Sequence, residues 1–488
     1  MPDLRQDKRL AELHAFIRDS LSGWGVPSAA VAVVDKQRVI YRKAFGLADR
    51  ENEIKAREDT VYYVASCTKA FTAALAGILH DEEVLDWNRP VCRYLKDFAF
   101  RDPVATERLT LRDLLSHRTG LARHEWVWMG AGTCREELAR RVQHLDFSAD
   151  IRTTYRYNNL AYVLAAYVMK QCSGQSWESL VEDRLLKPLG MDDTTVLRHK
   201  LPKAEAKGYI RRPGSETATP WIEGWIAGMD DELTGGNPLA PAGGLNSTLD
   251  DMTRWIQFQL GDGSTGDRRI LSKDTFRTLH SPHIPIPKPP KEPELLDASY
   301  APGWVVQPYR GHRRLWHSGN FGGFNSNASF LPDKNLGVIL LTNIDASPLE
   351  HVIPFRVYDL LLELKPVNWN HRFKQKMEKK KAERKPEKDL KKEPSAESLD
   401  EYSGVYHHPG YGELAVSSEG GKLAIQKHFA RFSAEPDIQD RFLLQQDIPL
   451  TDPIEGMFKR TRSGEIHAVT VKFDPEVEPV VFVKRKDP

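Results

Sequence analysis

Short apolar runs rich in β-branched residues occur near both ends of the first 365 residues, and longer helical patterns lie between them. Residues 28–47 hold two such runs on either side of the polar turn Asp35-Lys36-Gln37, which predicts a hairpin. The same reasoning predicts further strands at 304–306, 315–318, 327–331 and 336–343. Strands are therefore expected from both ends of this part of the chain.

The helical patterns fill the middle. Residues 66–80 are rich in Ala and Leu, with Gly77 the only Gly or Pro, so a helix is predicted to begin near Ser66. Others follow at 107–117, 134–144, 158–173, 176–186 and 349–364. This order does not fit a simple alternating βαβ array. It predicts an α/β (α+β) fold, a mostly antiparallel sheet covered by helices, with a helical subdomain.

The pattern changes after residue 365. Residues 366–398 are dense in Lys and Glu and are expected to be a charged, solvated linker or exposed helix. A nuclear-targeting or anion-binding patch is the alternative, weakened by the interleaved acidic residues. Residues 399–488 then show short β-type runs, which predict a small β-rich C-terminal domain after a main domain at 8–365.

Composition narrows the class of protein. The 488 residues are 40% hydrophobic and 28% charged, as in a soluble globular protein, and the net charge of +1 gives no reason to expect nucleic acid as a partner. Without a membrane-length or signal-type apolar run, we expect a cytoplasmic protein with no membrane partner. The four cysteines lack zinc-site spacing, so free thiols are favoured over two long-range disulfides, and no metal site is expected.

Candidate chemistry begins at Ser66-Cys67-Thr68-Lys69. Three residues along a helix is nearly one turn, so the amine of Lys69 can lie beside the hydroxyl of Ser66. A lysine acts as a base at neutral pH only when its pKa falls from ~10.4 to roughly 7.5, which takes about 4 kcal/mol of burial or charge repulsion. Alone, the motif also fits a helix-capping serine followed by an exposed lysine.

Two further segments support a catalytic interpretation. Tyr157-Asn158-Asn159 precedes a predicted helix and can supply a phenol and an amide to a cleft, although a packed tyrosine and a helix cap would have the same sequence. His317-Ser318-Gly319-Asn320 ends a predicted strand, where Gly319 permits close approach of a ligand. A tight glycine turn with an incidental histidine is the alternative.

Together and in this order, the three segments resemble those of the serine β-lactamase and penicillin-binding-protein-like family, including its D-aminopeptidases and esterases. The resemblance covers about 8–365 and extends to 59–60, 114–121, 188–191, 242–245 and 300–304, which look like the class C-like branch. The C-terminal β-domain is similar, less specifically, to small modules attached to some of these hydrolases.

The resemblance implies roles for individual residues. Ser66 would be the nucleophile, Lys69 and Tyr157 would share proton transfer, and the N–H groups of Ser66 and Asn320 would bind the oxyanion. Asn159, His317 and Gly319 would contribute to substrate binding, with Asn159 and His317 also orienting the Tyr157 hydroxyl. No cofactor is implied.

The family commonly has lysine where this chain has His317, a mostly neutral residue at pH 7. We therefore expect a hydrolase of small peptides, amides or esters with weak penicillin hydrolysis. Open alternatives are an esterase or transesterase, a weak β-lactamase, and a catalytically silent scaffold or binding protein. The partner is expected to be a small molecule or short peptide, and an oligomer is possible.

Overall fold

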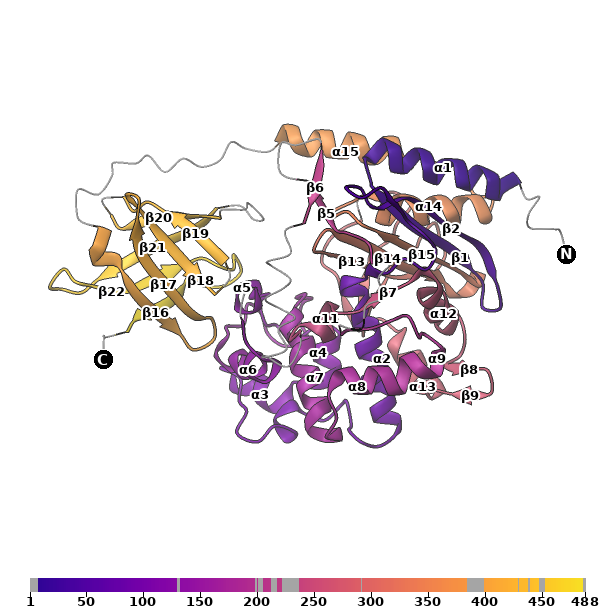
Figure 1. Ribbon diagram of the computed structural model, residues 1–488. Helices are drawn as coiled ribbons and strands as arrows, with labels where there is room; N and C mark the ends of the chain where they lie inside the picture. The colour runs from indigo at the N-terminus through magenta and orange to yellow at the C-terminus, as the bar shows by residue number, and fades with distance from the viewer. Residues whose placement is uncertain are drawn as a thin grey trace.

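The computed structural model describes residues 8–129, 132–197, 200, 205–211, 217–221, 237–290, 292–383, 399–428, 430–437, 439–446 and 453–485 (Figure 1). Its main part is a layered structure around one large sheet, and a separate barrel of strands lies beside the helical side of that part. The fold class expected from the sequence is confirmed.

The sheet has nine antiparallel strands in the order β10-β11-β12-β13-β14-β15-β1-β2-β3, so that strands from both ends of the domain meet at β15 and β1. The strands are β1 (Ser28–Val34), β2 (Val39–Asp49), β3 (Ile54–Lys55), β10 (Ile284–Pro285), β11 (Ser299–Ala301), β12 (Trp304–Val306), β13 (Leu315–Phe321), β14 (Phe324–Leu331) and β15 (Leu336–Thr342).

Both faces of this sheet are covered, which explains why every residue of β1 is buried. Alternate residues of a strand point to opposite faces. Ala29, Val31 and Val33 pack in the cluster with α1 (Lys8–Trp24) and α14 (Leu349–Leu361), whereas the residues between them pack toward α2 (Thr68–Asp81) and α12 (Leu249–Gln259). Helix α12, like α13 (Lys273–Leu279), was not predicted from the pattern.

The helical subdomain lies on the α2 side of the sheet (Figure 1). It contains α3 (Pro103–Arg108), α4 (Leu111–Leu115), α5 (Glu125–Trp128), α6 (Arg135–Arg141), α7 (Asn159–Ser173), α8 (Trp177–Val181) and α9 (Lys187–Leu189), with a π-helical turn between the last two. The predicted helix at 66–80 is α2 preceded by the 3-10 turn η2 (Ala65–Cys67), and the short helix α11 (Ala240–Gly243) lies against both.

The residues expected to form a charged linker begin with a helix, α15 (Trp369–Glu383). Trp369 is fully buried and its indole N–H donates to Asp359 Oδ2 at 2.8 Å, and Asn370 bonds to Trp24 and Ser20 of α1. Aromatic and polar contacts thus pack the first turn of α15 on the main part of the chain. The charged composition of this segment, on which the expectation of a linker was based, does not reveal these contacts.

The C-terminal strands form a closed antiparallel barrel. They are β16 (Gly404–His408), β17 (Gly412–Glu419), β18 (Lys422–Lys427), β19 (Ala430–Ala434), β20 (Arg441–Gln446), β21 (Ile454–Arg460), β22 (Ile466–Val471) and β23 (Val480–Lys484). Alternating burial along β17 and β18 places Leu414, Leu423 and Ile425 in the interior, as expected where one face of each strand is the core.

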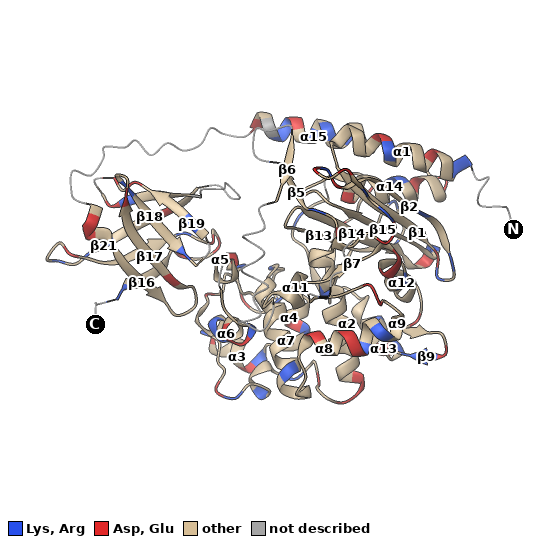
Figure 2. Cartoon of the chain, in the orientation of Figure 1, with Lys and Arg blue, Asp and Glu red and all other residues tan. Residues whose placement is uncertain are grey.

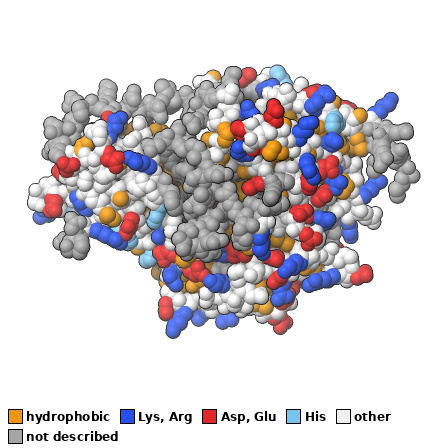
Figure 3. All heavy atoms as spheres, viewed as in Figure 1, with side chains coloured by type: hydrophobic (Ala, Val, Ile, Leu, Met, Phe, Trp, Pro, Cys, Tyr) orange, Lys and Arg blue, Asp and Glu red, His pale blue; other side chains and the backbone are white. Residues whose placement is uncertain are grey.

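Acidic and basic side chains are interspersed over the described elements rather than segregated (Figure 2). The face in Figure 3 shows the same mixture among its described residues. Within the parts of the chain that the structure describes, no helix combines the length and the hydropathy needed to span a bilayer.

Candidate active site

Ser66 lies in the turn η2, where the start of α2 meets the end of β13. Ala65 holds a positive φ of 45°, an unusual conformation for a residue with a side chain, and this bends the chain just before Ser66. Gly319 of β13 passes so close that an added Cβ would lie 2.1 Å from the carbonyl oxygen of Val64 and 3.0 Å from the nitrogen of Ser66. Only glycine fits between this strand and the turn.

Lys69 is fully buried one turn after Ser66. Its Nζ is 3.1 Å from Ser66 Oγ, 2.8 Å from Asn159 Oδ1 and 2.7 Å from the carbonyl oxygen of Ala242 on α11. Three segments of the chain, η2 with α2, α7 (Asn159–Ser173) and α11, therefore meet at one amine. The predicted proximity of Ser66 and Lys69 is present in the structure, whereas Asn159 bonds to Lys69 and Glu125 and not to the Tyr157 hydroxyl that it was expected to orient.

Burial holds the pKa of Lys69 well below its ordinary value, because an ammonium group is poorly solvated in this interior. The carboxylate of Glu125 acts in the opposite direction and raises this pKa, and the guanidinium of Arg123 lowers it. Burial is the largest of these effects, so the neutral amine is favoured.

Tyr157 contacts Ser66 from the other side. Its hydroxyl donates to Ser66 Oγ at 2.9 Å, and burial raises the pKa of this phenol above its ordinary value. Behind it, the ring of His117 packs 4.3 Å away, centroid to centroid, and His117 Nδ1 accepts the backbone N–H of Asn158 at 3.1 Å. Asn158 itself caps α7 by accepting from Ala161, and this fixes the residues on each side of it.

The structure does not place His317 on the Tyr157 hydroxyl as expected. Its Nε2 is 2.9 Å from the hydroxyl of Tyr300 and its Nδ1 is 2.7 Å from the carbonyl oxygen of Ser318. Since that carbonyl can only accept, Nδ1 carries the proton and Nε2 accepts from Tyr300. Both ring nitrogens are used within the protein, which leaves neither for Tyr157 or a substrate. Burial lowers the pKa of His317 to about 3, so the ring is neutral.

Asn320 follows on β13 with an exposed side chain. Its Oδ1 accepts the backbone N–H of Ala346 at 2.6 Å, so the side chain is held away from Ser66 by the loop after β15. The proximity of Gly319 to the nitrogen of Ser66 nevertheless brings this end of β13 to the nucleophile.

Sequence reasoning missed Arg123 and Glu125. Glu125 accepts from Asn159 Nδ2 at 3.3 Å and pairs with Arg123, whose guanidinium lies 5.1 Å from the centroid of the Tyr157 ring. They come just after the recognised segment at 114–121. Nothing in their spacing signals the site, because contact with Asn159 and Tyr157 arises only when residues 123–125 fold beside residues 157–159.

His124, the residue between Arg123 and Glu125, is held by contacts with the C-terminal barrel. His124 has a positive φ of 48°, its Nδ1 is 2.7 Å from the hydroxyl of Tyr411, and its backbone N–H donates to Asp474 at 2.9 Å. Trp126, only 3% exposed, packs on Phe432 and Phe473 of the barrel. The segment 123–126 thus contacts the catalytic candidates on one side and the barrel on the other.

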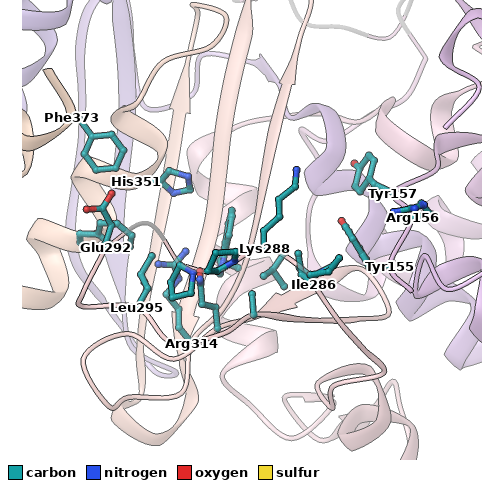
Figure 4. A pocket seen from close by; sticks show the side chains of 18 of the residues that line it. Tyr155, Arg156, Tyr157, Ile286, Lys288, Glu292, Leu295, Arg314, His351 and Phe373 are labelled. Atoms are coloured by element: carbon teal, nitrogen blue, oxygen red, sulfur yellow. The ribbon is translucent and has the colours of Figure 1, made fainter. Parts of the chain in front are cut away.

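A cavity of about 630 Å³ opens beside Tyr157. Figure 4 shows Tyr155 and Tyr157 at one end and Glu292, His351 and Phe373 at the other, with the loop carrying Ile286 and Lys288 between them. Arg156 at the tyrosine end pairs with Glu476 of the C-terminal part at 3.1 Å. Both parts of the chain therefore line this space.

The four cysteines are free thiols. Cys67, next to the nucleophile candidate, is buried with its Sγ 3.2 Å from Ser326 Oγ, and burial raises its pKa to about 12, so its thiol stays protonated. Among the described residues, no group of three or more His, Cys, Asp or Glu side chains is arranged to hold a metal ion.

The fold combines an antiparallel sheet that is covered on both faces with a helical subdomain. Where the two meet, a buried lysine and a tyrosine contact a serine. This combination defines the class of penicillin-recognising serine enzymes and their relatives. The family model described as Beta-lactamase matches residues 13–362, well over half of the chain. The protein therefore belongs to the beta-lactamase family, as the resemblance implied. Residues 388–484 match a domain of unknown function, DUF3471.

Known proteins similar to the chain extend this comparison. It is 28% identical over 433 residues to "Unguisins hydrolase ungD'" of Aspergillus campestris (strain IBT 28561), covering 84% of this chain and 77% of that protein. The octameric penicillin-binding protein homologue from Pyrococcus abyssi shares the fold with a TM-score of 0.64 at 20% identity, covering 96% of this chain and 99% of that one. EstCE1, described as a hydrolase with promiscuous acyltransferase activity, aligns at 19% identity with a TM-score of 0.63, over 73% and 99% of the two chains.

Proposed function

We propose that this protein is a serine hydrolase that cleaves amide or ester bonds of small molecules or short peptides through an acyl-enzyme on Ser66. The observation that carries the proposal is the pair of contacts on Ser66 Oγ, from the buried amine of Lys69 and from the hydroxyl of Tyr157. Two similar proteins are named as hydrolases, which supports the same class of reaction.

Lys69 acts as the base for acylation. A neutral amine has two N–H groups and one lone pair. Its neighbours Asn159 Oδ1 and the Ala242 carbonyl are both acceptors, and they take the two N–H groups. The lone pair then faces the remaining neighbour, Ser66 Oγ, and can receive its proton as the oxygen attacks the acyl carbon.

Tyr157 acts as the acid. Its raised pKa keeps it a phenol at neutral pH, and this phenol already donates to Ser66 Oγ. When the tetrahedral intermediate collapses, Tyr157 gives its proton to the leaving nitrogen or oxygen and recovers one from Lys69. In deacylation, water replaces the leaving group and the same transfers run in reverse, which releases the acid and restores Ser66.

The developing oxyanion is bound by the backbone N–H groups of Ser66 and Asn320. The tight packing of Gly319 against Val64 and Ser66 supports this role, since it brings the end of β13 beside the nucleophile. Loss of one such donor typically raises the barrier by about 3 kcal/mol.

His317 supplies no positive charge for a substrate carboxylate next to the nucleophile, because its pKa is lowered to about 3 and both of its nitrogens are occupied. We therefore expect hydrolysis of penicillin to be slow relative to that of neutral esters or amides. Transesterase activity is the second candidate function, and it is favoured by the likeness to EstCE1, which is described as a hydrolase with promiscuous acyltransferase activity.

A substrate panel tests the proposal. Purified protein is assayed with a short-chain nitrophenyl ester, D- and L-aminoacyl amides, short peptides and a penicillin, beside the Ser66→Ala variant. Hydrolysis of an ester or amide that disappears in Ser66→Ala is the expected result. Equal activity of the variant contradicts the assignment of Ser66, and inactivity of the native protein on the whole panel favours the scaffold alternative.

A further inference from the structure

The floor of the cavity beside Tyr157 carries buried donors that have no acceptor among the described residues. Arg314 is 1% exposed, and neither its Nε nor its Nη1 has a hydrogen-bond partner in that part of the chain. The same holds for the indole Nε1 of Trp316, two residues further along the chain in β13. Both side chains line the cavity. Unsatisfied buried N–H groups in the wall of a cavity fit a ligand that offers acceptor oxygens.

Arg314 is also a charge without a described counterion. Its guanidinium lies between aromatic rings, 4.7 Å from the centroid of Trp316 and 4.9 Å from that of Phe355. Burial lowers its pKa to about 10, so it remains a cation at neutral pH. A buried cation that only stacks on rings is poorly compensated, and a carboxylate would supply two acceptors and the missing charge in the planar geometry that guanidinium groups bind best.

Apart from Lys288, the other charged side chains that line the cavity form ion pairs. Its lining includes four cationic side chains, Arg123, Arg156, Lys288 and Arg314, against two carboxylates, Glu292 and Glu476. Glu476 pairs with Arg156, and Arg123 pairs with Glu125. Glu292, at the α15 end, pairs with both Arg372 and Lys376. The lining thus favours an anion, and its carboxylates do not reach Arg314 by any described contact.

Arg314 is remote from the nucleophile. Gly319 lies against Ser66, and Arg314 comes five residues earlier in the same extended segment, so the backbone positions of Arg314 and Gly319 are roughly 16 Å apart at the usual strand rise. The path between them is bordered by Ile286, Val305 and Trp316, which are mainly apolar.

We propose that this cavity binds the far end of the substrate and that Arg314 holds a carboxylate there. The preferred substrate is then an elongated, largely apolar molecule with a terminal carboxylate remote from the bond that is cleaved. A short linear peptide with a free C-terminus and a long acyl chain ending in a carboxylate share this chemistry. This inference rests on the proposed function in one respect: Ser66 is taken to attack the ester or amide bond of the same substrate.

Calorimetry with the full-length Ser66→Ala protein tests this without turnover. The probes are two pairs that differ only in the carboxylate: decanoate against decanamide, and acetyl-tetraalanine acid against its C-terminal amide, in D and L forms. In at least one pair the acid should bind about 10- to 100-fold more tightly, as for a charge-assisted hydrogen-bonded pair. The pair that shows the preference identifies the source of the carboxylate.

Arg314→Met in the same background should weaken the acid much more than the amide and so remove the preference, and Arg314→Lys should restore part of it. Arg313→Met is the matched control, because Arg313 is the neighbouring residue but bonds to the carbonyl of His280 instead of lining the cavity. If Arg314→Met fails to fold, Trp316→Phe removes one donor only and should weaken the acid several-fold.

Equal affinity within both pairs, no binding of any probe, or a preference that survives folded Arg314→Met would overturn the proposal. These outcomes are independent of the hydrolase assignment, which the activity of Ser66→Ala in the substrate panel decides separately.

Discussion

The proposed chemistry depends most on the side-chain amine of Lys69. Its three neighbours leave one position for a lone pair, and burial makes the neutral form accessible. The protonated form cannot accept a proton from Ser66. Activity must therefore fall as pH decreases through the lowered pKa of Lys69 and must be retained above it.

Lys69→Arg places a guanidinium, which does not deprotonate, where a base is required. We expect kcat/KM to fall on the order of 1000-fold, within the usual range for loss of a general base. Lys170→Arg is the control, since Lys170 pairs with Glu136 on the surface. The measurement is the pH profile of ester hydrolysis; a Lys69→Arg variant with a native rate and profile would exclude Lys69 as the base.

The variant Tyr157→Phe distinguishes protonation of the leaving group from the other steps of acylation. A nitrophenolate leaves without a proton, whereas an amine must receive one, so the variant should lose about 100-fold or more on an amide and clearly less on a nitrophenyl ester. Comparing kcat/KM for the two substrates measures this. An equal loss on both would assign Tyr157 to orienting Ser66 rather than to protonating the leaving group.

At the scale of elements, the site depends on β13 lying against η2 without a side chain between them. Gly319→Ala puts a Cβ 2.1 Å from the Val64 carbonyl, a contact that forces the strand or the turn to move. We expect loss of most activity and a lower melting temperature. Gly23→Ala, whose Cβ would meet nothing closer than 3.5 Å, is the control. Native activity of folded Gly319→Ala would show that this approach is not required.

The sequence predicted these elements well but not their contacts. The onset of α2, the hairpin of β1 and β2, and β12 to β15 follow from local pattern and turn residues, and the proximity of Ser66 to Lys69 follows from helix spacing. The orientation of His317 does not, because it is set by Tyr300 on β11, two strands away. Glu125 was missed because its contact with Asn159 depends on the tertiary fold, which brings the first residue of α5 to the first residue of α7.

In the whole molecule, the barrel and the catalytic candidates share the segment 123–126. Trp126→Ala removes a buried tryptophan that packs on Phe432 and Phe473, which should cost about 3–5 kcal/mol of stability. It should also lower kcat/KM, because Arg123 and Glu125 lose their support. Val481→Ala, at an exposed barrel position, is the control. A stable Trp126→Ala protein with unchanged kcat/KM would mean that the barrel does not support the site.

The most direct test of the account is the intact mass of the protein after reaction with a fluorophosphonate, followed by peptide mapping. We predict one covalent adduct per chain, located on Ser66, absent from Ser66→Ala and formed very slowly in Lys69→Met. An unmodified mass for the native protein, or an adduct that persists in Ser66→Ala, would contradict the claim that Ser66 is an activated nucleophile.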